Sequence, residues 1–197
     1  MDLDVLTERY NLLKEKNTDI GHFMDDLALA VKETNAERVF EFGVRYGAST
    51  IAFLHALYNG GLLYSVDCSF PVTDVETGID LLSSQGPLGC VPYWVFMLGY
   101  DTSHMIYDAL PTRCDVLFID TNHVYEETLA ELEKWSSRVR VGGRILLHDT
   151  FIEYTGNDPK PEPTQWPVRK AVEEFCAKYS LPYEFKDIYP GLGTIYV

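Results

Sequence analysis

Short apolar runs alternate with helical stretches along most of this chain, and that alternation limits the folds open to it. Seven runs have the length and composition of strands, at residues 38–42, 62–66, 94–98, 116–119, 144–147, 183–188 and 194–197. Helical patterns cover residues 49–58, 102–110, 124–139 and 168–179. Strands that alternate with helices predict a doubly wound α/β fold, with helices on both faces of one sheet.

Three local patterns add detail. The run Val116-Leu117-Phe118-Ile119 is apolar throughout, which is typical of a strand buried on both faces of a parallel sheet. Gly142-Gly143 ends the long helical stretch, so we expect the fifth strand to begin at Arg144. Only a short turn at Pro190-Gly191 separates the last two runs, which predicts a hairpin with one antiparallel strand.

The 197 residues fit a single domain. Residues 1–35 look helical and amphipathic, and they either pack beside the sheet or help to form a homodimer. Residues 153–167 contain four prolines, so no regular element is expected to run through them. A loop of this length predicts a lid or substrate loop, with a plain surface excursion as the alternative.

The formal net charge of −14 argues against a nucleic-acid partner, because an acidic surface repels phosphate backbones. No apolar run reaches the roughly 20 residues that span a bilayer. The acidic start of the chain carries no signal-peptide pattern. Four scattered cysteines include no CxxC pair of the kind that a zinc site uses. We therefore expect a cytoplasmic protein with neither a membrane nor a nucleic-acid partner.

Ionisable side chains lie at or just after the ends of five successive strand patterns. They are Glu41, Asp67, Asp101, Asp120 and the pair His148-Asp149. Because ligands of an open parallel sheet bind beyond the carboxyl ends of its strands, we expect these side chains at one edge of the sheet. Acids crowded together repel one another, so a ligand with many donors, or a cation, would offset that cost.

The loop after the first strand discriminates between ligands. Gly43 and Gly47 allow the backbone and the start of the next helix to approach a ligand carboxylate. A dinucleotide fold uses G-x-G-x-x-G, whereas this chain reads E-x-G-x-x-x-G. Glu41 suits a ligand with an ammonium group. Asp67 suits ribose hydroxyls, and Asp101 suits an adenine amino group. This set favours S-adenosylmethionine over NAD.

Five motifs of the chain resemble those of class I S-adenosylmethionine-dependent methyltransferases. They read VFEFGVRYGAS at 39–49, YSVD at 64–67, LGYDT at 98–102, LFIDTNHVYE at 117–126 and GGRILLHD at 142–149. More narrowly, the chain resembles the small-domain group that includes natural-product sugar O-methyltransferases and cephalosporin-hydroxylase-like proteins. The resemblance covers about residues 36–150. It implies a Rossmann-like, mostly parallel seven-stranded sheet of order 3-2-1-4-5-7-6, in which strand seven is antiparallel.

The resemblance also implies roles for single residues. Glu41 would bind the methionine amino group and Asp67 the ribose, with Asp101 near the adenine. The residues expected to line the methionine part are Gly43, Tyr46, Gly47 and Ser49. Two positions depart from the family pattern: Tyr100 separates the glycine from the acid of the third motif, and Thr121-Asn122 replaces a common Gly-Asp pair after strand four.

Methyl transfer to a hydroxyl requires in-line approach to the sulfonium and loss of a proton. His123 is the candidate base, because the unperturbed pKa of histidine lies near neutrality. Asp120 and Asp149 are the groups expected to orient His123 or the acceptor. Alternatively, Asp120, His148 and Asp149 hold Mg²⁺, although a histidine in place of a third carboxylate suits this ion less well.

The sequence thus predicts an S-adenosylmethionine-dependent methyltransferase that acts on a hydroxyl of a small-molecule acceptor. Three alternatives stay open. One is a metal-dependent sugar or catechol-type O-methyltransferase. The second is a protein that binds S-adenosylmethionine without catalysis, which the Thr121-Asn122 pair keeps open. The third is a nucleotide-sugar or NAD-binding enzyme, which the glycine spacing disfavours.

Overall fold

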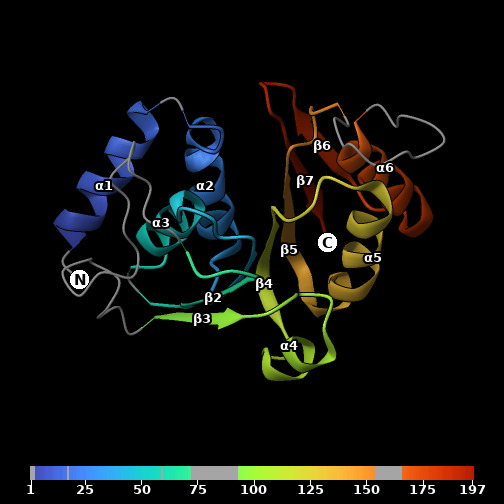
Figure 1. The fold of residues 1–197 in the computed structure, drawn as a ribbon, viewed down its shortest axis with the longest axis horizontal. Coiled ribbons are helices and arrows are strands. Elements are labelled where there is room, and N and C mark those ends of the chain that lie inside the picture. The colour runs from blue at the N-terminus through green and yellow to red at the C-terminus, as the bar shows by residue number, and fades with distance from the viewer. Residues whose placement is uncertain (1–2, 17, 59, 72–92, 154–165) are drawn as a thin grey trace.

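A seven-stranded sheet forms the middle layer of the protein (Figure 1). The computed structural model describes residues 3–16, 18–58, 60–71, 93–153 and 166–197. The strands are β1 (Arg38–Phe42), β2 (Leu62–Asp67), β3 (Trp94–Leu98), β4 (Cys114–Ile119), β5 (Val139–His148), β6 (Tyr183–Lys186) and β7 (Leu192–Tyr196).

The strand order is β3-β2-β1-β4-β5-β7-β6, as the resemblance implies. Neighbouring strands from β3 to β5 are parallel, and β7 runs antiparallel to both β5 and β6. The predicted α/β fold, its strand order and its antiparallel seventh strand are therefore confirmed.

Helices cover both faces of the sheet (Figure 1). One face carries α1 (Leu3–Glu15), α2 (Met24–Thr34) and α3 (Ala48–Ala56), and the other carries α4 (His104–Ala109), α5 (Tyr125–Trp135) and α6 (Pro167–Tyr179). Two short 3-10 helices cover Gly21–Phe23 and Ser136–Arg138. Most of the described residues before β1 are thus helical, and these helices pack beside the sheet, while a homodimer stays a prediction. Among the helices that the structure describes, none is both long and apolar enough to cross a bilayer.

Strand β4 is buried on both faces, as its apolar sequence predicts. Val116 and Phe118 join the core under α1, α2 and α3. Leu117 and Ile119 join the core under α4, α5 and α6. Because successive side chains of a strand point to opposite faces, this one run contributes to two hydrophobic cores.

The region between α5 and β5 differs from the prediction. The helix expected at 124–139 ends at Trp135, and β5 begins at Val139 rather than Arg144. Gly142 and Gly143 therefore lie inside the strand. Gly142 adopts φ +80°, and a Cβ on Gly143 would lie 2.6 Å from the carbonyl oxygen of Asp115. The two glycines allow an irregularity in the pairing of β4 with β5, so they extend the strand instead of starting it.

The loop expected at 153–167 lies mostly outside the described residues. Glu153 and Trp166 are described at its two ends. Pro167 is not part of the loop, because it is the first residue of α6. The fixed φ of proline and its missing N–H suit the first position of a helix.

Candidate active site

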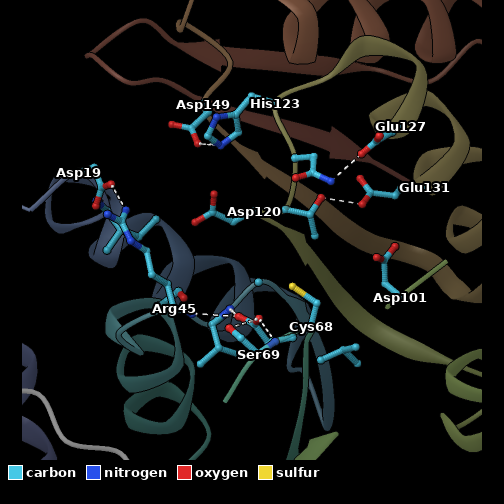
Figure 2. A pocket seen from close by; sticks show the side chains of 18 of the residues that line it. Asp19, Arg45, Cys68, Ser69, Asp101, Asp120, His123, Glu127, Glu131 and Asp149 are labelled. Atoms are coloured by element: carbon cyan, nitrogen blue, oxygen red, sulfur yellow. Dashed lines mark hydrogen bonds and ion pairs between the residues drawn. The ribbon is translucent and has the colours of Figure 1, made fainter. Parts of the chain in front are cut away.

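A cavity of about 730 Å³ lies beyond the carboxyl ends of β1 to β5 (Figure 2). Eight of the predicted site residues line it: Gly43, Tyr46, Ser49, Asp67, Asp101, Asp120, His123 and Asp149. Three others, Glu41, Gly47 and His148, do not line it. Asp19, Ile20, Tyr189 and Pro190, which the sequence analysis did not predict, also contribute to its wall.

The loop after β1 has an unusual backbone. Gly43, Arg45 and Gly47 adopt φ values of +89°, +49° and +83°. A Cβ on Gly43 would overlap the backbone carbonyl of Asp120, so only glycine allows β1 and β4 to end this close together. Gly47 is the N-cap of α3, which places the free N–H groups of that helix beside the cavity.

Glu41 lies beneath this loop rather than in the cavity. Its fully buried carboxylate accepts hydrogen bonds from three hydroxyls, of Ser49 at 2.6 Å, Thr50 at 2.9 Å and Ser65 at 2.5 Å. Trp94 Nε1 donates in turn to the Ser65 hydroxyl at 2.8 Å. Burial raises the pKa of Glu41 to about 7, although the hydroxyl donors oppose the shift. Glu41 therefore reaches the cavity only through Ser49, which corrects the expectation of direct contact with an ammonium group.

Asp67, at the end of β2, holds the glycine loop in place. Its Oδ2 accepts from the backbone N–H groups of Val44 at 2.8 Å and Arg45 at 3.1 Å. Its Oδ1 accepts from the N–H of Ser69 at 2.9 Å and from the Ser69 hydroxyl at 3.1 Å. Burial alone would raise the pKa of Asp67, but these donors outweigh it and lower the pKa. Asp67 is thus an ionised group at the cavity wall.

Asp101 and Glu131 form a second acidic group, on the α5 side of the cavity (Figure 2). Both are buried, with 8% and 2% of their surface exposed. The Thr121 hydroxyl donates to Glu131 Oε1 at 2.6 Å. Burial raises the pKa of Glu131 to about 8 and also raises that of Asp101.

Glu131 is a site residue that the sequence analysis missed. The buried positions of α5 are Thr128, Glu131, Leu132 and Trp135, which follow the helical repeat. Glu131 therefore stands in the buried stripe of an amphipathic helix, where a charged residue is rare. That misplaced charge is the signal that could have identified it.

A third group of side chains centres on Asp149. Its Oδ2 is paired with His123 Nε2, and its Oδ1 lies 3.2 Å from His148 Nδ1. His148 Nδ1 also lies 3.3 Å from Asp120 Oδ1. Asp149 adopts φ +61°, a left-handed conformation that few residues other than glycine accept. This backbone turns its carboxylate between the two imidazoles.

In this group, the carboxylates raise the pKa values of the two histidines, and the histidines lower the pKa of Asp149. Burial alone would lower the pKa of His148, but the charges of Asp120 and Asp149 outweigh it and raise the pKa to about 10. The hydrogen bond with Asp149 raises the pKa of His123. Burial alone would raise the pKa of Asp149, whereas His123 and His148 hold it well below its usual range. His148 thus lies buried between two carboxylates that favour the protonated form of its ring.

These charges revise the predicted metal set. Asp120, His123 and Asp149 each offer one ligand atom, and the three atoms lie within 4.8 Å of one another. Two carboxylates and an imidazole suit a transition metal better than Mg²⁺. In this set, His123 takes the place that the sequence analysis gave to His148.

Comparisons with known proteins agree with this architecture. Residues 40–150, more than half of the chain, match the profile of a family described as a methyltransferase domain. A search of curated protein sequences finds no match.

Solved structures with the same fold include methyltransferases. An O-methyltransferase from Bacillus cereus, solved with S-adenosylhomocysteine, is 17% identical, with a TM-score of 0.64 over 99% of this chain and 90% of that one. TomG, an O-methyltransferase of tomaymycin synthesis from Streptomyces achromogenes solved with S-adenosylmethionine, is 15% identical, with a TM-score of 0.68 over 100% and 91% of the two chains. The family match and the seven-stranded sheet together show that this chain belongs to the methyltransferase domain family and has its class I fold.

Proposed function

We propose that the protein transfers a methyl group from S-adenosylmethionine to a hydroxyl group of a small molecule. The observation that carries the proposal is one cavity beyond the glycine loop whose lining includes both Ser49 and Asp67 and the group Asp120, His123 and Asp149. Ser49 and Asp67 suit the amino-acid and ribose parts of the cofactor. His123 offers a base, and Asp149 is the carboxylate paired with it.

The acidic lining supports a cationic cofactor. Seven acids line the cavity: Asp19, Asp67, Asp101, Asp120, Glu127, Glu131 and Asp149. Among the described residues, Arg45 is the single lysine or arginine in the lining, and it pairs with Asp19 at 3.2 Å. A sulfonium and an ammonium group would each lower the repulsion among these carboxylates.

The binding roles follow from these contacts. The Ser49 hydroxyl, which Glu41 orients, and the free N–H groups at the start of α3 would hold the methionine end. Asp67 would accept from the ribose hydroxyls. Glu41 keeps its place in the site as a positioning residue, because its carboxylate fixes the rotamer of Ser49.

S-adenosylmethionine, when bound, would supply the methyl group: the new carbon–oxygen bond would form as the carbon–sulfur bond breaks, and S-adenosylhomocysteine would leave. His123 Nε2 is committed to Asp149, so the acceptor proton would be taken up at Nδ1. Asp149 would then stabilise the imidazolium, in the manner of the carboxylate of a catalytic triad.

The same lining indicates the charge of the acceptor. At an effective dielectric constant of about 40 and a separation of about 8 Å, each carboxylate repels an added negative charge by roughly 1 kcal/mol. Residues 72–92 contain no lysine or arginine, and residues 154–165 contain one lysine, so these two segments carry little positive charge. The acceptor is therefore a neutral or cationic molecule, not a phosphorylated one.

A second candidate function keeps the same cofactor but adds a metal. Asp120, His123 and Asp149 support it, since a divalent ion there would hold the acceptor oxygen and lower its pKa. Titration with Mn²⁺ and Co²⁺, followed by EDTA, separates the two. Turnover that survives EDTA and gains nothing from the ions supports the first candidate.

Other features support a cytoplasmic protein without a nucleic-acid partner. Cys68, Cys114 and Cys176 are free, in keeping with a reducing compartment. The net charge of −14 disfavours contact with phosphate backbones.

Calorimetry with S-adenosylhomocysteine and with NAD tests the cofactor. We expect micromolar binding of the former and none of the latter, and the reverse result would overturn the proposal. Methyl transfer is then measured on neutral and phosphorylated hydroxyl compounds. On an acceptor found in this way, His123→Ala should lower kcat by about 100-fold or more. His104→Ala is the matched control, because His104 is exposed and does not line the cavity.

A further inference from the structure

One lysine of α5 binds the turn that leads from β3 into α4. Lys134 Nζ donates to three consecutive backbone carbonyls, of Asp101 at 3.2 Å, Thr102 at 2.6 Å and Ser103 at 3.2 Å. A lysine ammonium has three N–H donors, and the three carbonyls match that number. The ammonium therefore occupies the position of a bound monovalent cation, except that it is tethered to a helix.

Two of these carbonyls receive no backbone hydrogen bond. Within the described ranges, no backbone N–H donates to the carbonyl of Asp101 or Thr102, while Tyr107 N donates to that of Ser103 at 3.1 Å. Neighbouring carbonyl oxygens that converge on one point repel one another, because each carries a partial negative charge. Without a cation among them, we expect the turn to rearrange so that its carbonyls can bind water instead.

Two aromatic rings hold the lysine in place. Lys134 Nζ lies 5.3 Å from the ring centre of Tyr107 and 5.4 Å from that of Trp135. Trp135 is fully buried, and the two rings lie 5.0 Å apart. A cation within about 6 Å of an aromatic face is attracted to it. The core therefore restricts the lysine side chain, so that less conformational freedom is lost when it binds the carbonyls.

The turn belongs to the wall of the cavity. Gly99, Tyr100, Asp101 and Thr102 all line the cavity. Lys134 is not among the described residues that line it, so the lysine lies behind this wall. A change in the position of the three carbonyls would therefore alter the surface that a ligand meets, although the lysine itself is set back from it.

We propose that Lys134 is a positioning residue for the cofactor, whose ammonium group holds the turn between β3 and α4 in the shape that binds S-adenosylmethionine. The inference rests on the proposed function and adds to it a residue outside the cavity. If the turn has its binding shape for only a fraction of the time, the dissociation constant rises by the reciprocal of that fraction. Loss of the ammonium should therefore weaken cofactor binding and leave the group around Asp149 in place.

The sign of the effect separates this role from long-range electrostatics. The lining is acidic, so the loss of a nearby positive charge would by itself favour a cationic ligand. S-adenosylmethionine carries a net positive charge. Weaker binding of this ligand after the removal of Lys134 would therefore oppose the change in charge, whereas it follows directly from a displaced turn.

The test is calorimetry of S-adenosylhomocysteine and S-adenosylmethionine binding to Lys134→Met, which keeps an apolar stem beside the two rings. We expect both dissociation constants to rise about tenfold or more. On an identified acceptor, the KM for the cofactor should rise by a similar factor, with kcat at saturating cofactor within about threefold of the unmodified protein. Lys178→Met is the matched control and should change neither, because Lys178 lies on α6 and pairs with Glu133 outside the cavity.

Chemical rescue tests the ammonium group itself. In Lys134→Ala, added propylammonium chloride should restore about half or more of the lost affinity, because propylammonium has three N–H donors on a short apolar stem. Tetramethylammonium chloride at the same concentration supplies the same charge without an N–H donor, so it should restore nothing. If Lys134→Ala shows no cooperative unfolding in urea, the affinities of Lys134→Met decide the question.

The outcomes separate the two proposals. Affinities of Lys134→Met within about twofold of the unmodified protein, even with a lower urea midpoint, would show a role in stability alone and overturn the inference. Equal effects of the two salts on Lys134→Ala, including no effect of either, also overturn it. Both results leave the methyltransferase proposal intact. Failure of the unmodified protein to bind S-adenosylhomocysteine overturns both proposals.

Discussion

The substitution Glu41→Gln tests the electrostatics of the loop that carries the cofactor site. Glu41 is fully buried, and its carboxylate accepts from the hydroxyls of Ser49, Thr50 and Ser65. Glutamine has nearly the same shape and keeps one acceptor oxygen. The change therefore removes an ionisable group and leaves the packing in place, so its main effect is on how the stability depends on pH.

The size of the effect follows from the pKa of Glu41. Burial raises it from 4.5 to about 7. A group whose pKa is raised by folding contributes stability that is fully present below its unfolded pKa and is lost as the pH rises through its folded pKa. The shift of about 2.5 pH units corresponds to roughly 3 kcal/mol, lost between pH 4.5 and pH 7. Glutamine has no such loss.

Urea unfolding followed by tryptophan fluorescence measures this difference. The isoelectric point near 4.6 favours precipitation at the acid end, so the practical range is pH 5.5 to 7.5. Across that range, we expect Glu41→Gln to gain about 2 kcal/mol relative to the unmodified protein. Its stability at pH 5.5 should lie within about 1 kcal/mol of the unmodified protein, because one hydroxyl must reorient.

Glu37→Gln is the control, since Glu37 is exposed just before β1. It should leave the pH profile unchanged. If the profile of Glu41→Gln runs parallel to that of the unmodified protein, Glu41 does not ionise with a raised pKa in the folded state, and the argument from burial is refuted.

Three further substitutions test other parts of the structure. Gly43→Ala should weaken S-adenosylhomocysteine binding by more than about tenfold in calorimetry, because its Cβ would overlap the Asp120 carbonyl at a φ of +89°; unchanged affinity would contradict this geometry. Asp149→Asn should lower kcat by about 100-fold or more and change the KM for the cofactor by no more than about threefold, because it removes the carboxylate that pairs with His123 and leaves the cofactor-binding residues in place. A change in KM alone would argue against the assigned role. Trp135→Ala should cost about 3–5 kcal/mol of unfolding free energy in urea, since Trp135 is fully buried against Phe40 and Phe42; a loss below about 1 kcal/mol would contradict its place in the core.

The strands were the part of the fold most readily predicted from the sequence. β1 and β3 have the predicted bounds, because each is a short apolar run between polar turns. β5 was predicted too short, since the Gly142-Gly143 pair reads as a break in the sequence. In the structure, the close approach of the Asp115 carbonyl explains why glycines are required there. A sequence shows that a glycine pair is flexible, but it does not show which neighbouring atom approaches so closely that glycine is required.

Within the site, the positions of the acids were predictable, but their contacts were not. Eight predicted residues line one cavity, because the carboxyl ends of parallel strands share an edge. Whether a side chain there faces the ligand depends on its strand face and its neighbours. Glu41 points to the same face of β1 as Val39, beneath α3, and its carboxylate accepts hydrogen bonds from hydroxyl groups there instead of facing the cavity. Glu131 was missed because it comes from the middle of a helix and not from the end of a strand.

The four hydrogen bonds to Asp67 have a consequence for selectivity. A carboxylate has about four lone-pair positions, and Val44, Arg45 and Ser69 already use that number. A ribose hydroxyl can therefore enter only by exchange, and the Ser69 donors, in the turn after β2, are the ones that can leave without loosening the glycine loop. Such an exchange yields little net enthalpy from the ribose. A ligand must therefore break a hydrogen bond between Ser69 and Asp67 before it can form its own hydrogen bond to Asp67, and a ligand whose hydroxyl is poorly placed gains nothing from this exchange.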